Sequence, residues 1–492
     1  MNPKTHPTYC HYPFHAMTFK KWSKDGREPI NVTPCCMMMN PVTSEEDGSV
    51  KHHSLGHGSL KGLSPEEIFN HESFEKLRND LSNGIKNEAC TVCWKMEEDG
   101  LESFRQCSDS SGPPHPNQEG LFEFDITLSN LCNLACRMCN VGSSHQLGKD
   151  VEKMKAKSLH NSFMAASNNA MPDVKGVIYD KDNNSVIDWL LDNTHKITML
   201  KASGGEPFYD RRVVKVLERY VETEASKNTI LKFHTNATQF TPALSKLLNN
   251  FKEQGHTFSI DGTHRIYNYI RHNSDWKKLN ESLDHYLSTC TNIKHQYFNM
   301  VLSSLNILNV ADYIEWICNK CAHYKIPDWY IHFSEMYPDN RGTSIRNVPK
   351  ELLEIALDRI IDITESGIAT VAQSDTVHAT IRGKEYKKWY RFNIHNLVGQ
   401  IQNAIDNHNG DVKKMKTEII ILDEVRDQSY KDYLDPLLVE ILNKEIKQNI
   451  RKTVKQQRKD MLKKYEGVLP GPYDHLKEGV DYLDDIQRNK RK

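Results

Sequence analysis

The chain has 492 residues with a formal net charge of -1 at neutral pH, and 38% of its residues are hydrophobic. This length is enough for two or three domains. The near-zero charge excludes a global field that would attract nucleic acid or an anionic membrane. No apolar run is long enough to span a bilayer, and the polar amino terminus lacks a signal-peptide core. We therefore expect a cytoplasmic protein without a membrane partner.

The 12 cysteines are grouped along the chain, and the first group lies in residues 1–120. Without a secretion signal, such grouping favours metal binding over disulfide bonds, which stay the alternative. This segment is irregular and rich in His, Gly and Pro, with only short helical stretches such as Ser64–Leu81. A segment so poor in periodic sequence cannot bury a large core, so we expect a metal site to hold it together.

Short apolar runs alternate with longer helical patterns from Leu121 onward. The predicted strands are Leu121–Leu128, Lys196–Ala202, Thr229–Thr235, His256–Ile260, Lys294–Leu302 and Asp328–Glu335. The predicted helices are Val186–Thr194, Arg211–Thr223, Pro242–Glu253, Trp276–Thr289, Val310–His323 and Pro349–Glu365. This alternation predicts successive βα units around a parallel sheet.

No Gly-x-Gly-x-x-Gly follows the first predicted strand. Six βα units without that turn fit a partial barrel better than a dinucleotide-binding fold. The connection between Cys139 and Lys196 is long for a single unit. We expect an insertion there, with mobile Asn-rich loops.

Three cysteines directly follow the first predicted strand. Cys132, Cys136 and Cys139 form a C-x3-C-x2-C pattern and supply three thiolates to one soft metal centre. An iron–sulfur cubane with three protein ligands leaves one iron open for a small molecule. A structural zinc site would add a fourth Cys or His at short range. The pattern therefore predicts an open, reactive iron–sulfur cluster.

Three further motifs follow later strands. The second strand leads into Ser203–Gly204–Gly205–Glu206–Pro207, the third ends at Thr235–Asn236, and the fourth leads into Ser259–Ile260–Asp261–Gly262. In this order after the cysteine triplet, the motifs resemble the radical S-adenosylmethionine (radical SAM) superfamily over roughly residues 121–337. Met138 is a departure, since the family usually carries an aromatic residue beside the last cysteine.

The resemblance implies an enzyme that cleaves SAM reductively at a [4Fe–4S] cluster to give a 5′-deoxyadenosyl radical. Cys132, Cys136 and Cys139 would bind three irons, and the amine and carboxylate of SAM the fourth. The implied SAM-binding residues are Gly204, Gly205, Glu206, Pro207, Thr235, Asn236, Ser259, Asp261 and Arg271. All follow the carboxyl ends of strands, where barrel active sites are built. No acid or base catalyst is predicted, because the radical itself abstracts hydrogen.

The amino-terminal cysteines resemble a twitch or SPASM domain, which binds an auxiliary [4Fe–4S] cluster. The segments that carry this resemblance are Tyr9–Phe14, Val32–Cys36 and Cys90–Trp94. The implied ligands are Cys10, Cys35, Cys90 and Cys93, with Cys36 as the alternative to Cys35. Such a domain commonly follows the barrel, whereas this one precedes it. Zinc bound by the same four residues is the alternative.

The last part of the chain is charged and predicted to be mainly helical. Arg382–Phe392 interleaves basic and aromatic residues, as grooves for single-stranded nucleic acid do. Lys444–Lys464 is strongly basic and is a candidate for binding phosphates or an acidic leader peptide. A solvated charged surface is the alternative for both segments.

The predicted fold is an α/β protein with three parts. Residues 1–120 form the twitch/SPASM-like auxiliary-cluster domain, 121–345 the radical SAM partial (βα)6 barrel, and 346–492 a charged helical extension. Twitch and SPASM relatives often modify peptides or proteins, and some act on small molecules. Modification of a peptide or protein side chain is therefore the leading hypothesis. Radical modification of a nucleotide or RNA, and a non-catalytic sensor or scaffold, are the alternatives. The expected protein partner is a one-electron reductant such as flavodoxin or ferredoxin.

Overall fold

The fold is described by a computed structural model. It covers residues 7–20, 31–39, 43–44, 50–51, 64–98, 103–106, 120–168, 171, 184–335, 341–373, 375–408 and 410–443. Contacts group Met1–Val439 into one compact unit and Glu440–Lys492 into a second. Across the described ranges, no helix has the length and apolar character needed to cross a membrane.

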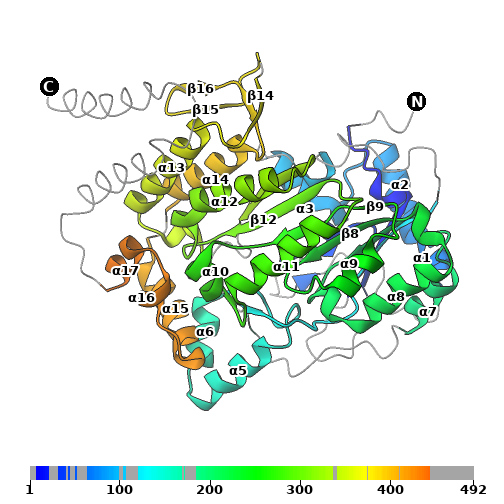
Figure 1. Cartoon of the computed structure of the whole chain (residues 1–492), viewed down its shortest axis with the longest axis horizontal. Helices are drawn as coiled ribbons and strands as arrows, with labels where there is room; N and C mark the ends of the chain where they lie inside the picture. Colours follow the sequence, from blue (N-terminus) through cyan, green and yellow to red (C-terminus); the bar gives the residue numbers. More distant parts are fainter. Residues whose placement is uncertain are drawn as a thin grey trace. The chain divides into compact units, whose positions relative to one another are not determined.

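Six parallel strands form the centre of the first unit (Figure 1). In sheet order they are β5 (Glu123–Ile126), β7 (Met199–Ala202), β8 (Ile230–Thr235), β10 (Thr257–Ser259), β12 (Gln296–Leu302) and β13 (Trp329–Glu335). Each strand pairs in parallel with the next one along the chain. All six predicted strands are confirmed, and so is the predicted mixed α/β class with a parallel sheet.

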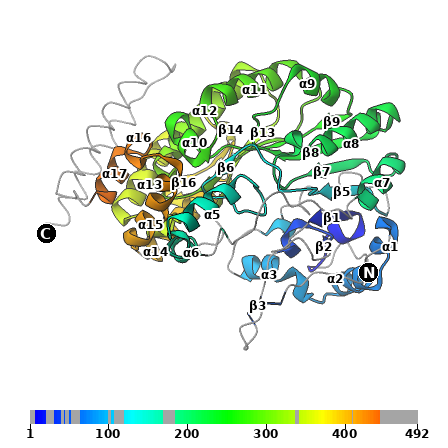
Figure 2. The same ribbon diagram turned by 90° about the horizontal axis from the view of Figure 1, so that it is seen from below.

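Helices connect these strands and cover one face of the sheet (Figure 2). They are α7 (Asn184–Asp192), α8 (Arg211–Glu222), α9 (Pro242–Leu248), α10 (His264–Ile270), α11 (Trp276–Thr289), α12 (Val310–His323) and α13 (Lys350–Glu365). Aromatic pairs join sheet to helices, as between Phe258 and Tyr286, whose ring centroids are 5.5 Å apart. Because side chains alternate along a strand, the strand residues that flank Phe258 point to the opposite face of the sheet. The helices predicted for this region are present, but α9 ends at Leu248, and the predicted helix end at Glu253 lies instead in the short strand β9 (Glu253–Gln254).

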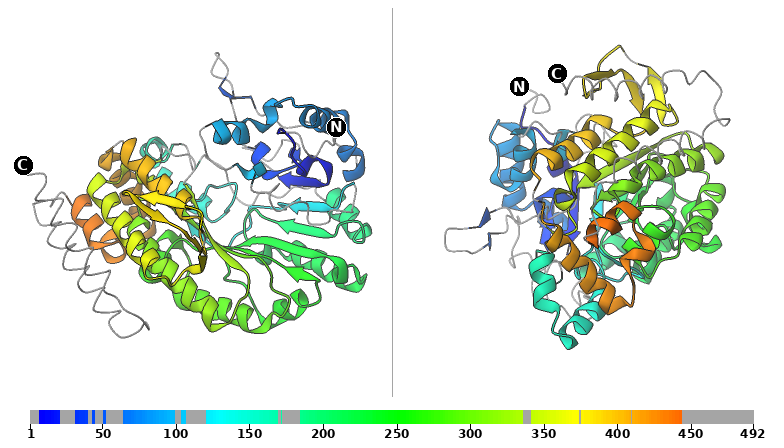
Figure 3. Two further views of the ribbon diagram at one scale, coloured as in Figure 1. Left: turned by 90° about the horizontal axis from the view of Figure 1, so that it is seen from above. Right: turned by 90° about the vertical axis from the view of Figure 1, so that its left-hand side faces the viewer.

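The amino-terminal segment adds two strands to the same sheet (Figure 3). β1 (Ala16–Lys20) pairs in parallel with β5, and β2 (Asn31–Thr33) pairs antiparallel with β1. The predicted helical stretch is confirmed as α1 (Pro65–Phe69) and α2 (Glu72–Ser82). Other short elements here are η2 (Tyr12–Phe14), η3 (Cys36–Met39), β3 (Thr43–Ser44), β4 (Val50–Lys51), η4 (Glu88–Cys90) and α3 (Thr91–Glu98). The domain boundaries after residues 120 and 345 stay predictions.

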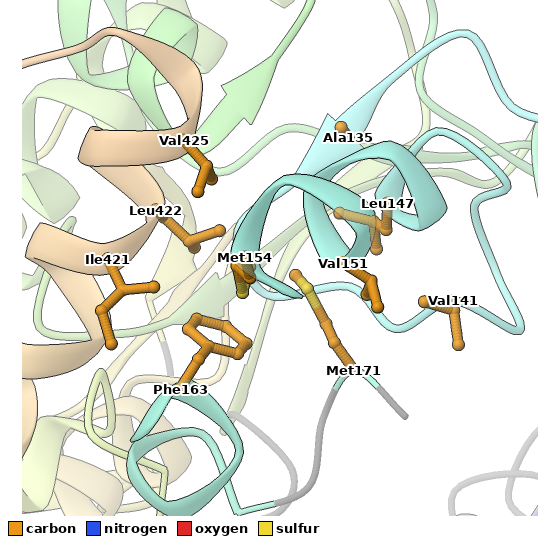
Figure 4. Packing of buried hydrophobic residues seen from close by; sticks show 10 residues of the cluster. All are labelled: Ala135, Val141, Leu147, Val151, Met154, Phe163, Met171, Ile421, Leu422 and Val425. Atoms are coloured by element: carbon orange, nitrogen blue, oxygen red, sulfur yellow. The ribbon is translucent and has the colours of Figure 1, made fainter. Parts of the chain in front are cut away.

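The insertion after the cysteine triplet contains helices as well as turns where the structure describes it. α5 (Leu147–Ala156) and α6 (His160–Ala166) precede α7. The Asn-rich stretches that were expected to form mobile loops lie mostly outside the described residues. Their apolar faces meet Ile421, Leu422 and Val425 of α15 (Val412–Arg426), as Figure 4 shows. This packing joins segments far apart in the sequence, and local composition does not reveal such a distant partner helix.

The carboxyl-terminal part contains short strands as well as helices. The strands are β14 (Thr370–Gln373), β15 (Ala379–Ile381), β16 (Lys384–Tyr386) and β17 (Lys388–Tyr390), and the helices α14 (Ile394–Asp406), α16 (Tyr430–Tyr433) and α17 (Pro436–Leu442). β14 pairs with β17 and β15 with β16, both antiparallel. The basic segment Lys444–Lys464 lies outside the described residues.

The remaining elements are β6 (Ala135–Cys136), η5 (Pro207–Tyr209), η6 (Ala225–Asn228), β9 (Glu253–Gln254), β11 (Arg271–His272), η7 (Ile307–Asn309) and η8 (Ile345–Asn347).

Candidate functional site

The three central cysteines lie together in the loop that follows β5. Cys132 and Cys136 are buried, and the partly buried Cys139 packs against the same small cluster. The amide of Leu134 donates to Cys132 Sγ at 3.4 Å, and Asn236 Nδ2 donates to the same sulfur at 3.9 Å. The sequence therefore brings its three predicted ligands to one place.

Burial raises the pKa of all three thiols, for Cys136 to about 12. The Arg271 guanidinium acts in the opposite direction on the pKa of Cys136 and Cys139. A cation is what such a site needs, because a bound metal removes the proton from a coordinating thiol. The donor set therefore fits a positively charged, thiophilic group.

The second cysteine is fixed by backbone pairing. Cys136 in β6 pairs antiparallel with Arg271 in β11, and the Arg137 amide donates to the Ile270 carbonyl at 2.8 Å. This short ladder places the Arg271 side chain beside the cysteines. Its guanidinium forms a buried ion pair with Asp261, Nη2 to Oδ2 at 2.6 Å.

Asp261 also ties two strand ends together. Its Oδ1 accepts from the Val301 amide at 2.8 Å, so the carboxylate joins the end of β10 to β12. Two buried polar atoms nearby, Arg271 Nε and the Tyr313 hydroxyl, have no hydrogen-bond partner among the described residues. A buried donor without a partner is costly, so these atoms fit a site that receives a polar ligand or ordered water.

The glycine turn lies directly on the segment that leads into Cys132. The Glu206 amide donates to the Leu131 carbonyl at 2.7 Å, and the Gly205 amide to the Ser129 carbonyl at 3.3 Å. Gly204 has a φ of +115°, and a Cβ on it would meet Thr127 Cγ2 at 2.5 Å. The glycines thus serve a close backbone approach to the cysteine loop.

Glu206 links this turn to the end of β8. Its buried carboxylate accepts from Thr235 Oγ1 at 2.7 Å and from the Asn236 amide at 2.6 Å. Burial raises the pKa of Glu206 to about 7, although these donors lower it. Pro207 is buried at the start of η5. Asn236 completes the link to the loop, because its Nδ2 donates to Asn133 Oδ1 at 2.8 Å.

The uncovered face of the sheet is polar and partly exposed. Ser259 lies on this face with Asn299 as its register partner on β12. The others that follow from the strand registers are His234, Thr257, Tyr297, Tyr330, His332 and Ser334. His332 Nδ1 and Asn299 Oδ1 are 2.7 Å apart, and the rings of Tyr297 and Tyr330 stack at 6.1 Å. Ser259 is the residue of this face that was predicted from the sequence, although polar residues alternate along β12 and β13.

The amino-terminal cysteines line one pocket. Its lining includes Cys10, Cys35, Cys90 and Cys93, together with Tyr12, Met38, Phe104 and Arg105. Burial raises the pKa of Cys93 and raises that of Cys90 to about 12. The Arg105 guanidinium lies over the Trp94 ring in a cation–π contact and forms a 2.8 Å ion pair with Glu97. The four predicted ligands are therefore neighbours, while the side chain of Cys36 lies outside the described set.

No group of three or more His, Cys, Asp or Glu in the described ranges is arranged to hold a single metal ion. A mononuclear zinc site needs all its ligands around one atom. A cubane instead takes its thiolates on different irons.

Three further cysteines lie in the helical layer of the first unit. Cys318 and Cys321 lie on α12 and are buried, 4% and 1% exposed, and Cys290 is buried at the end of α11. Burial raises the pKa of Cys318 to about 12. These thiols are part of the core.

Comparisons with known proteins give distant structural similarity only. No family model matches the chain, and no curated protein matches it. Three crystal structures of Streptococcus suis SuiB are similar in part. The first has 14% identity and a TM-score of 0.30, and the match covers 63% of this chain and 55% of SuiB.

The second SuiB structure is bound to S-adenosylmethionine and the third to the precursor peptide SuiA. Their identities are 15% and 14%, with TM-scores of 0.30 and 0.29. The second covers 61% of this chain and 62% of SuiB, and the third 56% and 60%. The chain thus spans less than two thirds of the SuiB chains it matches, and TM-scores near 0.3 define neither its fold nor its function.

Proposed function

We propose that the chain is a radical SAM enzyme that modifies a side chain of a peptide or protein. The observation that carries this proposal is the clustered cysteine triplet, which is joined by backbone pairing to Arg271 at the carboxyl ends of parallel strands. In this proposal the six βα units are the partial (βα)6 barrel of the superfamily, and its carboxyl-terminal edge is the active site.

Cys132, Cys136 and Cys139 are the proposed cluster ligands. Their close packing and the adjacent guanidinium match a site that is completed by a metal cluster. When bound, the reduced cluster with SAM supplies a 5′-deoxyadenosyl radical that abstracts hydrogen from the substrate. The partner that supplies the electron is proposed to be a flavodoxin or ferredoxin, in the cytoplasm.

The proposed SAM-binding residues divide into two kinds by their contacts. Ser259 and Arg271 offer polar side chains, and the unpartnered Arg271 Nε is available to a carboxylate or hydroxyl. The other residues hold the loops around the proposed cluster in place, through the close glycine contacts, the Glu206 carboxylate and the Asp261 ion pair. They are Gly204, Gly205, Glu206, Pro207, Thr235, Asn236 and Asp261.

The amino-terminal pocket is proposed to hold an auxiliary [4Fe–4S] cluster bound by Cys10, Cys35, Cys90 and Cys93. All four side chains line that pocket. Zinc is the competing occupant, because tetrahedral zinc sites with four cysteine ligands use the same residue type. β1 pairs with β5, so this site is attached to the strand that precedes the central cysteine loop.

The polar face of the sheet is the proposed substrate surface. Tyr297 and Tyr330 are 39% and 41% exposed there, and they offer both aromatic rings and hydroxyls. A peptide, which carries amides along its whole length, matches such a mixture of donors, acceptors and rings.

The structure gives less support to nucleic acid as the substrate. Arg382 forms an ion pair with Asp358, and Lys384 pairs with Glu365 at 2.8 Å, both on α13. Arg391 stands over Trp329 at 4.8 Å. Basic groups already paired in this way contribute less to phosphate binding. A sensor or scaffold without catalysis is the third alternative.

Anaerobic iron and sulfide analysis tests the proposal. Reconstituted wild-type protein should contain about eight irons, and the Cys132→Ala/Cys136→Ala/Cys139→Ala variant about four. Equal iron in the two proteins would reject the central site. One zinc with only about four irons would keep that site and reject the auxiliary cluster.

A further inference from the structure

Helix α15 reaches the cysteine loop through buried charges. Its residues Glu418, Asp423 and Arg426 are 0%, 6% and 7% exposed. Charged side chains are rarely buried to this extent unless they are paired. Each of them forms an ion pair with an oppositely charged residue. Asp423 and Arg426 pair with residues in the segment that follows β5, and Glu418 pairs with a residue that follows β13.

The first pair acts on the backbone between two of the cysteines. Arg341 Nη2 is 2.6 Å from Glu418 Oε1 and 2.8 Å from the Arg137 carbonyl. Arg341 Nη1 donates to the Met138 carbonyl at 3.1 Å. Arg137 and Met138 are the two residues between Cys136 and Cys139, so this guanidinium holds the loop where it turns from one ligand to the next.

Both carboxylate oxygens of Glu418 accept hydrogen bonds. Besides Arg341, it accepts from the Thr343 amide at 3.0 Å and from Thr343 Oγ1 at 3.1 Å. A Cβ on Gly342 would be 2.6 Å from the Lys414 carbonyl, so the glycine lets this segment lie directly on α15. The arrangement is specific, because charge-assisted bonds of this kind depend on geometry.

A second ion pair holds the side chain of Arg137, which lies between the proposed ligands Cys136 and Cys139. Arg137 forms a buried ion pair with Asp423, its Nε donates to the Tyr269 carbonyl at 3.0 Å, and its guanidinium lies 3.6 Å from the Tyr269 ring. The Tyr269 hydroxyl donates to Asp423 at 2.8 Å. The third pair, Arg426 with Asp150 at 2.7 Å, joins α15 to α5.

We propose that α15 and Arg341 form an electrostatic clasp that fixes the cluster-binding loop and sets the charge around it. This inference rests on the proposed function, since it takes the loop to be the cluster ligand. Arg341, Glu418 and Asp423 are positioning residues, because they act through the loop backbone and through Arg137. Helix α15 is then a component of the cluster site rather than part of a separable extension.

The test compares Glu418→Gln with Glu424→Gln. Both changes remove one carboxylate from α15, but Glu424 is exposed and pairs with Lys157 on the surface, where ion pairs contribute little. Hydrogen–deuterium exchange of the metal-free protein is measured first. Glu418→Gln should speed exchange of the amides at residues 132–139 by roughly tenfold or more, and Glu424→Gln should not. Amides of β8 and β12 should be unchanged in both variants.

Unchanged loop exchange in Glu418→Gln would overturn the clasp, and so would equal acceleration in β8 and β12, which indicates general destabilisation. If Glu418→Gln lacks a cooperative thermal transition, Arg341→Lys takes its place. Lysine keeps the charge but lacks the fork that reaches the carboxylate and both carbonyls. Unchanged loop exchange in that variant would also overturn the clasp.

The second readout is the midpoint potential of the central cluster in reconstituted protein. Removing the Glu418 charge should raise it, because the reduced cluster carries one more negative charge. Glu424→Gln should leave it unchanged, and equal potentials in all three proteins would overturn the electrostatic part of the inference. Wild-type protein that takes up no iron would instead reject the proposed function, while the exchange result would still decide the clasp.

Discussion

Gly205 and Leu131 lie closer together than any side chain would allow. A Cβ atom on the glycine would be 2.0 Å from the Leu131 carbonyl oxygen. Because the neighbouring atoms are backbone, the strain has no cheap relief. The contact explains why the turn after β7 and the loop after β5 form one structure around the cysteines.

The change Gly205→Ala should therefore separate the turn from the loop. We expect the free energy of unfolding to fall by about 3 kcal/mol, the upper range for overpacking, and iron uptake to fall with it. Gly399 on α14 is the matched control, since a Cβ there meets nothing within 4 Å. Gly399→Ala should stabilise the protein by about 0.5–1 kcal/mol. Denaturant unfolding of both variants measures this, and equal stability would refute the packing argument.

The Asp261–Arg271 pair should show strong coupling. Arg271→Met leaves a fully buried carboxylate without its cation and should cost about 3–5 kcal/mol. Adding Asp261→Asn removes the unpaired charge while its amide oxygen can still accept from Val301. The double variant should therefore be more stable than Arg271→Met alone. Additive losses in a double-mutant cycle would show that the two residues do not act as a pair.

His256 should make the protein sensitive to acid. Burial lowers the pKa of this ring to about 3, with a smaller effect from His234, and its Nδ1 accepts from the Phe233 amide. Below about pH 6.5 the unfolded chain gains a proton that the folded ring refuses, so stability is lost as the pH falls toward 3. The free energy of unfolding lost in this way between about pH 6.5 and pH 3 is about 5 kcal/mol. His256→Gln should lack this part of the pH dependence, and parallel stability profiles from about pH 7 to pH 4 would contradict the assignment.

The amino-terminal site should depend on its own cysteines. Cys93→Ser should lower iron from about eight to about four per chain and leave the central cluster in place. Cys318→Ser is the control, because Cys318 is buried on α12 away from the pocket lining. It should keep the full iron content. Loss of iron in both variants, or in neither, would contradict an auxiliary cluster at this pocket.

The order of the strands and the cysteine triplet could be predicted because both are local patterns. Each strand was a short apolar run bounded by polar turns, and the cysteines lie within eight residues of one another. The glycine turn was also found, but its packing role against Leu131 was not, since that contact joins distant segments.

The clasp on α15 could not be predicted from the sequence. Glu418, Asp423 and Arg426 alternate with apolar residues in a way that is typical of an exposed helix, and their partners lie about 75–290 residues away. The pairing of β1 with β5 was missed for the same reason, because Ala16–Lys20 and Glu123–Ile126 lie far apart in the sequence. Long-range pairing is decided by tertiary packing and not by local propensity.

Release of 5′-deoxyadenosine tests the central claim most directly. Reconstituted wild-type protein, reduced with dithionite and given SAM, should release it, and the Cys132→Ala/Cys136→Ala/Cys139→Ala variant should not. Absence of release from wild-type protein that carries its full iron and sulfide content, next to an active control enzyme, would contradict the proposed function.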